Sequence, residues 1–289
     1  MHAIKKLKGR VLLVAFAHAE MSGAHARLKR QAIALQLFDA ISLNTENDLD
    51  AAFREEFRDV LTESVRGFGY YVWKPQIILQ VLKEAEYGDV IVYLDSGSHV
   101  NRRGKKRMEE YISICKKSAS GFLAFQLTLS ERLWTKKRLI EHFGLAKDDP
   151  LLYSGQVQAG LILIEKRERT VELLEEWLAV YRSDLALVDD SLDEEEISGF
   201  REHRHDQSVF SLLAKIRGFE LLDAREQFPG TQDPSSRAGS WSTLKYFPIH
   251  HKRDKYVGAK RALTMTANLL FPQGSRTREM IVRYRSREG

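Results

Sequence analysis

The sequence predicts an α/β protein with a mixed, mostly parallel central sheet flanked by helices. Short apolar runs, such as residues 11–17 and 90–94, alternate along the chain with amphipathic stretches of helical length. The run at 90–94 is continuous and rich in β-branched and aromatic residues, which is typical of a strand buried on both faces. Strands and helices that alternate in this way form parallel sheets with helices on the faces.

The elements follow one another from the N-terminus. Strands are expected at 11–17, 39–44, 90–94, 121–127 and 160–164, and helices at 24–38, 49–63, 75–86, 102–117, 131–143, 169–181 and 209–216. The acidic stretch 189–196 and the Pro- and Gly-containing stretch 227–242 are expected to be loops. We expect one domain over residues 1–258, with a basic C-terminal extension, partly helical, over 259–289.

Composition places the chain among soluble globular proteins. It has 289 residues, 43% of them hydrophobic and 29% charged, and a net charge of +5 that favours anionic partners. The single cysteine, Cys115, excludes an intrachain disulfide and a cysteine-built zinc site. No apolar run approaches the roughly 18 residues of a membrane-spanning helix. We expect a cytoplasmic protein, with peripheral contact to the inner face of a membrane through the basic extension; packing of that extension on the main domain is the alternative.

Asp95 follows the buried strand at 90–94 and is the first candidate functional residue. In open α/β sheets, ligands bind beyond the carboxyl ends of the strands, where Asp95 would emerge. A carboxylate there can hold a divalent cation against a diphosphate, and Gly97 leaves room for the ligand. The structural alternative is an aspartate that only caps a turn.

Lys74 is the second candidate. It lies in the Gly- and aromatic-rich segment 66–75, directly before Pro75, which suits the first turn of a helix. A lysine beside a helix N-terminus favours an anionic phosphate there. The alternative is that the segment is a packed loop without a ligand.

Two further polar clusters stand at the ends of apolar elements, at residues 203–206 and 250–251. Asp206 precedes an amphipathic helix, so its structural alternative is the N-cap of that helix. His250 and His251 follow a short apolar segment. Together with Asp95, these carboxylate and imidazole groups suit a divalent metal whose remaining positions are filled by phosphate.

Four segments, at 92–97, 158–164, 205–208 and 249–252, resemble GT-A-fold glycosyltransferases of the glycogenin-like and bacterial lipopolysaccharide galactosyltransferase-like families. The block 69–75 also resembles one in bacterial and viral polysaccharide-building glycosyltransferases. The resemblance spans roughly residues 10–255. It implies a GT-A-like (Rossmann-like) fold and transfer of a sugar from a UDP- or GDP-sugar to a saccharide or lipid-linked acceptor, in surface polysaccharide synthesis.

The resemblance also implies a role for each matching position. The nucleobase would lie along Ala15, Phe16 and Ala17. The rest of the donor would contact Arg66, Tyr70, Lys74, Gln158 and Gly160, with Lys74 on the diphosphate. Asp95 with His250 or His251 would hold Mn²⁺ or Mg²⁺, and Asp206 and Gln207 would face the reacting sugar carbon. Two positions depart from the families, because Gly97 replaces the second carboxylate of the DxD motif and Gln158 replaces an asparagine.

Two other functions remain open. A metal-dependent phosphohydrolase or nuclease would use Asp95, His203, His205 and Asp206, although such sites usually gather more carboxylates. A nucleic-acid-binding protein would use the basic cluster 102–107, although a charge run on a helix is usually a solvated face. We therefore expect a nucleotide-sugar donor and a sugar acceptor as partners and no nucleic acid.

Overall fold

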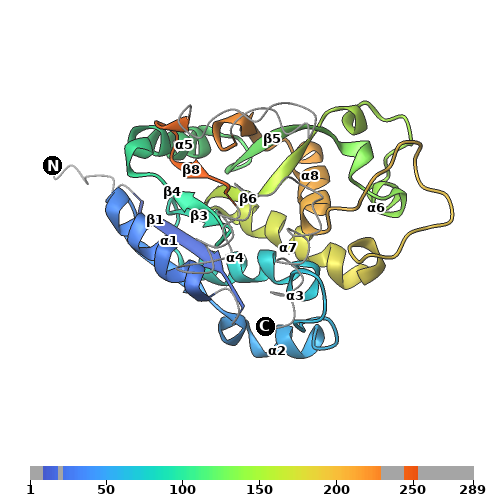
Figure 1. Cartoon of the computed structure of the whole chain (residues 1–289), viewed down its shortest axis with the longest axis horizontal. Helices are drawn as coiled ribbons and strands as arrows, with labels where there is room; N and C mark the ends of the chain where they lie inside the picture. Colours follow the sequence, from blue (N-terminus) through green and yellow to red (C-terminus); the bar gives the residue numbers. More distant parts are fainter. Residues whose placement is uncertain (1–8, 19–21, 229–243, 253–289) are drawn as a thin grey trace, which may run out of the picture.

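A six-stranded sheet forms the centre of the molecule (Figure 1). The computed structural model describes residues 9–18, 22–228 and 244–252. The strand order is β2-β1-β3-β6-β5-β7, with bounds β1 Val11–Phe16, β2 Ala40–Asn44, β3 Val90–Leu94, β5 Phe122–Ser130, β6 Gly155–Glu165 and β7 Glu220–Asp223. Only β6 opposes the others among these six, since β1–β2, β1–β3 and β5–β7 are parallel pairs and both neighbours of β6 are antiparallel to it. The expected mixed, mostly parallel sheet is confirmed.

The helices connect these strands. They are α1 Ser22–Leu35, α2 Ala51–Glu56, α3 Gly67–Tyr70, α4 Trp73–Glu84, α5 Lys105–Lys117, α6 Lys137–His142, α7 Glu168–Ser183 and α8 Asp206–Ile216, with short 3₁₀ turns η2 Glu46–Asp48, η3 Arg102–Gly104, η4 Glu131–Leu133, η5 Pro150–Tyr153, η6 Leu185–Leu187 and η7 Ala224–Glu226.

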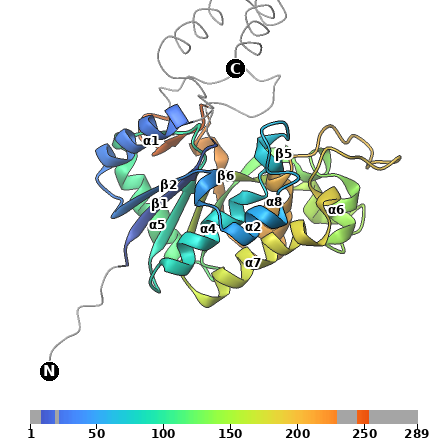
Figure 2. The same cartoon turned by 90° about the horizontal axis from the view of Figure 1, so that it is seen from below.

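Residue alternation along each strand divides the core into two layers. In β3, Ile91 and Tyr93 pack on one face, whereas Val90, Val92 and Leu94 pack on the other. The first face is covered by α4, α7 and α8 and the second by α1 and α5, as Figure 2 shows. All five residues of β3 are buried, so the prediction of a strand covered on both faces is confirmed. Asp95 has the same parity as Tyr93 and therefore belongs to the face of α4 and α8.

Three predicted helices are shorter than expected, and the one at 102–117 begins only at Lys105, after η3. The helix predicted at 49–63 ends at Glu56, although Phe53 and Phe57 still pack into the core. The helix predicted at 131–143 is split into η4 and α6. The carbonyl of Trp134 accepts hydrogen bonds from Ser208 Oγ and from the backbone amide of Arg204, so tertiary partners replace a helical one. Apolar spacing alone cannot reveal such competition.

The segment before α4 forms a left-handed turn. Five consecutive residues, Gly67 to Tyr71, have φ between 52° and 87°. Left-handed helical backbone costs about 1–2 kcal/mol for each residue with a Cβ, and three of the five carry one. The turn is held by hydrogen bonds from the amide of Tyr70 to the carbonyl of Arg66 (2.7 Å) and from Trp73 Nε1 to the carbonyl of Gly67 (3.0 Å). A packed loop was one of the two expectations for this segment, and its left-handed conformation was not expected.

A small second sheet brings the C-terminal described segment back to the main sheet. β4 His99–Val100 pairs antiparallel with β8 Ile249–His250, which directly precedes His251. Gly104 permits this return, because a Cβ on it would lie 2.3 Å from the backbone nitrogen of Pro248. The expected basic extension, 259–289, lies outside the described residues. Among the helices that the structure describes, none has the length and apolarity needed to cross a membrane.

We expect Gly104→Ala to destabilise the protein by about 1–3 kcal/mol, the usual cost of overpacking, since the atom it meets belongs to backbone. Urea denaturation measures the free energy of unfolding. Arg103→Ala, at the exposed neighbouring position, is the control and should change it by less than about 0.5 kcal/mol. Equal stability of Gly104→Ala and the wild type would show that Pro248 does not pack on Gly104.

Candidate functional site

Asp95 is held at the end of β3 by its own strand and by β6. Its backbone amide donates to the carbonyl of Gly160 (2.9 Å), and Tyr93 Oη donates to Asp95 Oδ1 (2.9 Å). Burial raises the pKa of Tyr93, so its hydroxyl remains a donor. The Asp95 side chain is 46% exposed, which leaves it accessible to a ligand.

Lys74 lies in the first turn of α4 and joins two carboxylates. Its Nζ is 2.5 Å from Asp206 Oδ2 and 3.4 Å from Asp95 Oδ1, and it donates to the carbonyl of Ala159 (3.1 Å). The lysine side chain is only 4% exposed. Two carboxylates and one ammonium give this trio one net negative charge. The trio joins β3, α4, α8 and β6, elements that are far apart in the chain.

The trio has perturbed protonation equilibria. Burial lowers the pKa of Lys74, but Asp206 and Asp95 raise it by more, so its pKa lies above the usual range. Burial raises the pKa of Asp206, and the attraction of Lys74 only partly opposes this. The two carboxylates thus explain the raised pKa of Lys74, and burial explains the raised pKa of Asp206. Lys74 stays protonated, whereas Asp206 is easier to protonate than an exposed aspartate.

Asp206 does not have the capping role that was its structural alternative. His205 is the N-cap residue of α8 and Asp206 is the first residue inside the helix, so that interpretation is wrong. His205 has φ 48°, a strained value for a residue with a Cβ, and its Nδ1 donates to the carbonyl of Val188 (2.6 Å). This geometry directs the Asp206 carboxylate at Lys74 rather than at the helix amides.

Gln207 is held by a buried polar network below α8. Its Nε2 donates to Gln156 Oε1 (2.6 Å), and Gln156 Nε2 donates to Glu131 Oε1 (3.1 Å). Glu131 is fully buried and its Oε2 accepts from Lys215 Nζ (2.7 Å) and from Ser211 Oγ. A fully satisfied buried network of this kind fixes side chains in one arrangement. It therefore fixes the first turn of α8 against β6.

Gly160 lies where three candidate side chains converge. A Cβ on this residue would lie 3.0 Å from Asp95 Oδ2, 3.1 Å from His251 Cε1 and 3.2 Å from Gln158 Oε1. β6 is irregular here, since its pairing with β5 shifts register between Leu163 and Gln158. Such irregularities are frequent beside functional sites, where they re-aim polar groups. The space above Gly160 is bordered by a carboxylate, an imidazole and an amide oxygen.

This donor set fits a divalent cation better through His251 than through His250. Ser98 Oγ lies 2.6 Å from His251 Nδ1, the kind of contact that orients a metal-binding imidazole, and Nε2 would then be the ligating atom. His250 instead has its Nε2 2.9 Å from the carbonyl of Leu244. Within 9–18, 22–228 and 244–252, no group of three or more His, Cys, Asp or Glu side chains could bind a metal. Asp95 and His251 are therefore the two side chains that could hold a cation here, and phosphate oxygens would have to fill its other positions.

The other predicted donor-binding residues have the following surroundings. Phe16 is buried and its ring stacks on Trp73 at 3.9 Å, while Ala15 and Ala17 are also buried. Arg66, whose side chain is 49% exposed, pairs with Glu202 (2.7 Å). The Tyr70 ring lies 5.2 Å from the ring of His205. Gln158 is buried and donates to Gln227 Oε1.

The groups that the two alternative functions would use have structural partners. The amide of Lys136 donates to His203 Nδ1 (3.4 Å), and burial lowers the pKa of His203. Within the basic cluster, Arg107 pairs with Glu226 (2.7 Å). His203 and Arg107 are therefore each held by contacts within the protein, and no ligand is needed to explain their positions.

Tyr71, Tyr93 and Ser98 also belong to the site, although the sequence analysis did not select them. The rings of Tyr71 and Tyr93 lie 5.5 Å and 5.3 Å from Lys74 Nζ. Strand alternation could have identified Tyr93, two residues before Asp95. No short-range signal reveals that Ser98 would meet His251, 153 residues later.

Neither the family models nor the curated proteins contain a match to this chain. Among solved structures, it is similar to mouse xyloside xylosyltransferase 1, with 11% identity and a TM-score of 0.48, over 86% of this chain and 99% of that one. It is similar to the bifunctional glycosyltransferase WbbM, with 14% identity and a TM-score of 0.47, over 87% and 47%. It is also similar to a glycosyltransferase involved in the glycosylation of the major capsid of PBCV-1, with 10% identity and a TM-score of 0.43, over 88% of this chain and 97% of that one. Identities and TM-scores this low do not establish the function of this chain.

The burial of Lys74 predicts a structural role as well as a functional one. We expect Lys74→Met to destabilise the fold by about 3–5 kcal/mol, because it leaves Asp206 buried without its counter-charge. Lys83→Met, on the same helix but exposed, should cost at most about 1 kcal/mol. Chemical denaturation measures both.

The double variant Lys74→Met/Asp206→Asn should recover part of the stability, since it removes both members of the pair. Additive losses in the double variant would mean that the two residues do not interact.

Proposed function

We propose that this protein is a glycosyltransferase that moves a sugar from a nucleoside-diphosphate sugar to a saccharide or lipid-linked acceptor. The observation that carries the proposal is the trio of Lys74, Asp95 and Asp206 beside Gly160. It puts an accessible strand-end carboxylate a few ångströms from a buried helix-start carboxylate, at the carboxyl end of β3, where open α/β sheets bind nucleotides.

The charge balance of the trio favours a metal-dependent donor site. Lys74 is already compensated by two carboxylates, so it does not by itself attract a diphosphate. The net negative charge attracts a cation. Asp95 and His251 would hold Mn²⁺ or Mg²⁺, which when bound neutralises charge that develops on the departing diphosphate. Gly160 leaves room for the phosphate oxygens.

Asp206 is the proposed catalytic residue. In an inverting reaction its carboxylate accepts the proton of the acceptor hydroxyl, and the raised pKa of Asp206 suits a proton acceptor. In a retaining reaction the same negative charge stabilises a positively charged sugar ring. Both courses need the carboxylate to be ionised. Lys74 favours that form, and Gln207 is held beside it by Gln156.

The proposed setting is surface polysaccharide synthesis on the cytoplasmic side of a membrane. It is supported by the resemblance of residues 69–75 to polysaccharide-building enzymes and by the basic composition of 259–289. A phosphohydrolase is less well supported, because the described residues lack the cluster of metal ligands that such sites use.

The donor site can be tested directly by calorimetry. We expect a nucleoside diphosphate to bind more tightly with Mn²⁺ than without it, and Asp95→Asn to remove that difference. Asp59→Asn, at a 94% exposed position, is the control and should leave it unchanged. Absence of binding for every nucleoside diphosphate, with and without metal, would contradict the proposed function.

Asp206→Asn tests the chemistry. It should leave donor binding intact and lower turnover by roughly 10² or more, the scale of a lost general base or charge. In the wild type, activity should fall as the pH drops through the pKa of Asp206. Because that pKa is raised, the fall should begin at a higher pH than for an exposed aspartate. Turnover by Asp206→Asn at the wild-type rate would restrict this residue to its ion pair with Lys74.

A further inference from the structure

The positive charge of the chain is concentrated on one side of the main sheet. α1 and the segment 102–117, which contains η3 and α5, lie on the same side (Figure 2). α1 has three basic residues and no acidic one, and 102–117 has seven basic residues and two acidic ones. These two segments therefore have an excess of eight positive charges. The net charge of the whole chain is +5, so the remainder of the chain is net negative.

Five of these cations are exposed, and we refer to them as the basic face: Lys29, Arg30, Arg102, Arg103 and Lys106. None of the five forms an ion pair with another residue of 9–18, 22–228 or 244–252. Of the two acidic residues in 102–117, Glu110 pairs with Arg107 (2.8 Å), so that carboxylate is already engaged. The basic face therefore lacks counter-charges within the described protein.

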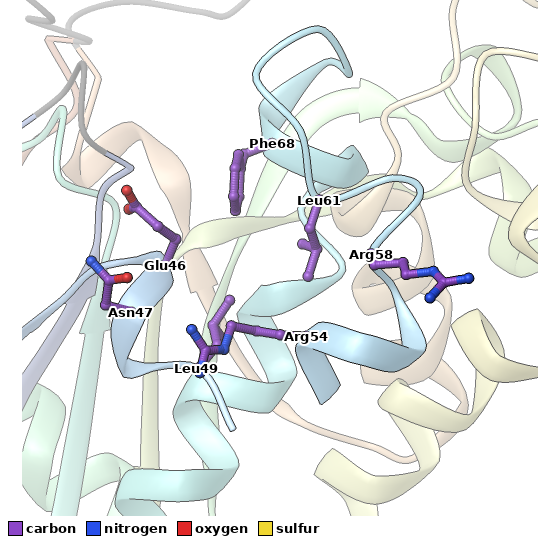
Figure 3. Close-up of a pocket in the computed structure, with 7 residues that line it drawn as sticks. All are labelled: Glu46, Asn47, Leu49, Arg54, Arg58, Leu61 and Phe68. Atoms are coloured by element: carbon purple, nitrogen blue, oxygen red, sulfur yellow. The ribbon is translucent and has the colours of Figure 1, made fainter. Parts of the chain in front are cut away.

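Several other surface arginines do have carboxylate partners. Arg58, at the wall of a cavity of about 260 Å³, pairs with Glu55 (2.7 Å; Figure 3). Two more pairs involve α7, on the other side of the sheet: Arg182 with Glu56 (2.8 Å) and Arg217 with Glu176 (2.6 Å). Pairs of this kind leave little field for a charged partner. The basic face, in contrast, presents its charge to solvent.

Hydrogen bonds hold the elements of the basic face together. In α1, Gln31 Nε2 lies 3.1 Å from His99 Nδ1, and Gln31 Oε1 accepts from the amide of Val100 (3.0 Å), directly before η3. Lys105 Nζ donates to the carbonyl of Gln36 (2.7 Å) and so joins the start of α5 to the end of α1. The cations of α1 and of 102–106 therefore lie on elements that contact each other.

α1 is also joined to the loop that carries the proposed metal ligand. Arg27 is buried, and its guanidinium donates to the carbonyls of Ser96 (2.8 Å) and Ser98 (3.1 Å), directly after Asp95. One helix thus bears two cations of the basic face outside and fixes this loop inside.

Ile33 adds an apolar group to the basic face. Its side chain is 58% exposed, and it lies one helical turn after Lys29 and Arg30 on the same side of α1. Cations around an exposed aliphatic side chain suit a bilayer interface, where headgroup phosphates attract the cations and the acyl boundary accepts the apolar group. In α1 and 102–117 no aromatic side chain is exposed for stacking on the bases of a single-stranded nucleic acid.

We infer that the basic face docks the protein on an anionic membrane, with its five cations on lipid phosphates and Ile33 in the headgroup region. This inference goes beyond the proposed function, because it assigns lipid binding to α1 and 102–106 rather than to 259–289. Each Lys or Arg near an anionic bilayer strengthens binding about fivefold, so five of them strengthen it by roughly 10³-fold.

Vesicle sedimentation with the full chain tests the inference. The wild type should bind vesicles of one part phosphatidylglycerol to two parts phosphatidylcholine, but not vesicles of phosphatidylcholine alone, and added salt should weaken the binding. Lys29→Gln/Arg30→Gln should weaken it by about 25-fold. Arg182→Gln/Arg217→Gln is the matched control: it removes the same charge from the other side of the sheet and should change binding less than about twofold.

Ile33→Ser should weaken vesicle binding several-fold, because apolar atoms buried at the interface contribute to it. Equal binding of the wild type to the two kinds of vesicle would overturn the inference, and so would equal losses in the two double variants. Release from the vesicles by a nucleic-acid duplex at equal phosphate concentration would assign the basic face to nucleic acid instead.

The two double variants should bind a nucleoside diphosphate as the wild type does, since neither changes a residue of the proposed site. Failure of vesicle binding therefore leaves the proposed function intact. The substituted positions on α1 are exposed, so the fold should be kept, and thermal denaturation checks this.

Discussion

The ammonium of Lys74 links every element of the proposed site. It lies at the start of α4 and contacts Asp95 after β3, Asp206 at the start of α8 and the carbonyl of Ala159 in β6. A buried charge is tolerated only where counter-charges and hydrogen bonds surround it. The positions of these four elements are therefore coupled. A shift of any one of them would leave Lys74 or one of its carboxylate partners without a neutralising contact, which costs free energy.

The same cation explains how this site can work with a single strand-end carboxylate. Two carboxylates without Lys74 would repel each other across a short, poorly solvated distance. With Lys74 between them, Asp206 remains close to the proposed sugar position and Asp95 keeps one oxygen toward Gly160. The lysine therefore holds the two carboxylates in place, and a metal ion near Asp95 and His251 would neutralise the diphosphate.

Backbone strain surrounds this charged centre. The left-handed turn of residues 67–71 precedes Lys74, and His205, with φ 48°, precedes Asp206. Packing offsets the strain, since Trp73 stacks on Phe16 and the rings of Tyr70 and His205 lie together. The turn also places the ring of Tyr71 5.5 Å from Lys74 Nζ.

The sequence by itself determined five of the six strands of the main sheet and the three charged residues of the trio. Strand periodicity identified β1, β2, β3, β5 and β6, because buried strands carry apolar, β-branched runs whose signal is local. The position of Asp95 after such a run was enough to select it. Lys74 and Asp206 were selected because each adjoins a helix start, although one was expected on phosphate and the other had capping as its alternative.

Only the tertiary structure decided which groups meet. Lys74 pairs with Asp206 across 132 positions of the chain, and Ser98 meets His251 across 153. Local propensity contains no information about such contacts. It also missed β7, the pairing of β4 with β8 and the left-handed turn, because short edge elements and strained backbone are stabilised by neighbours that lie far away in the sequence.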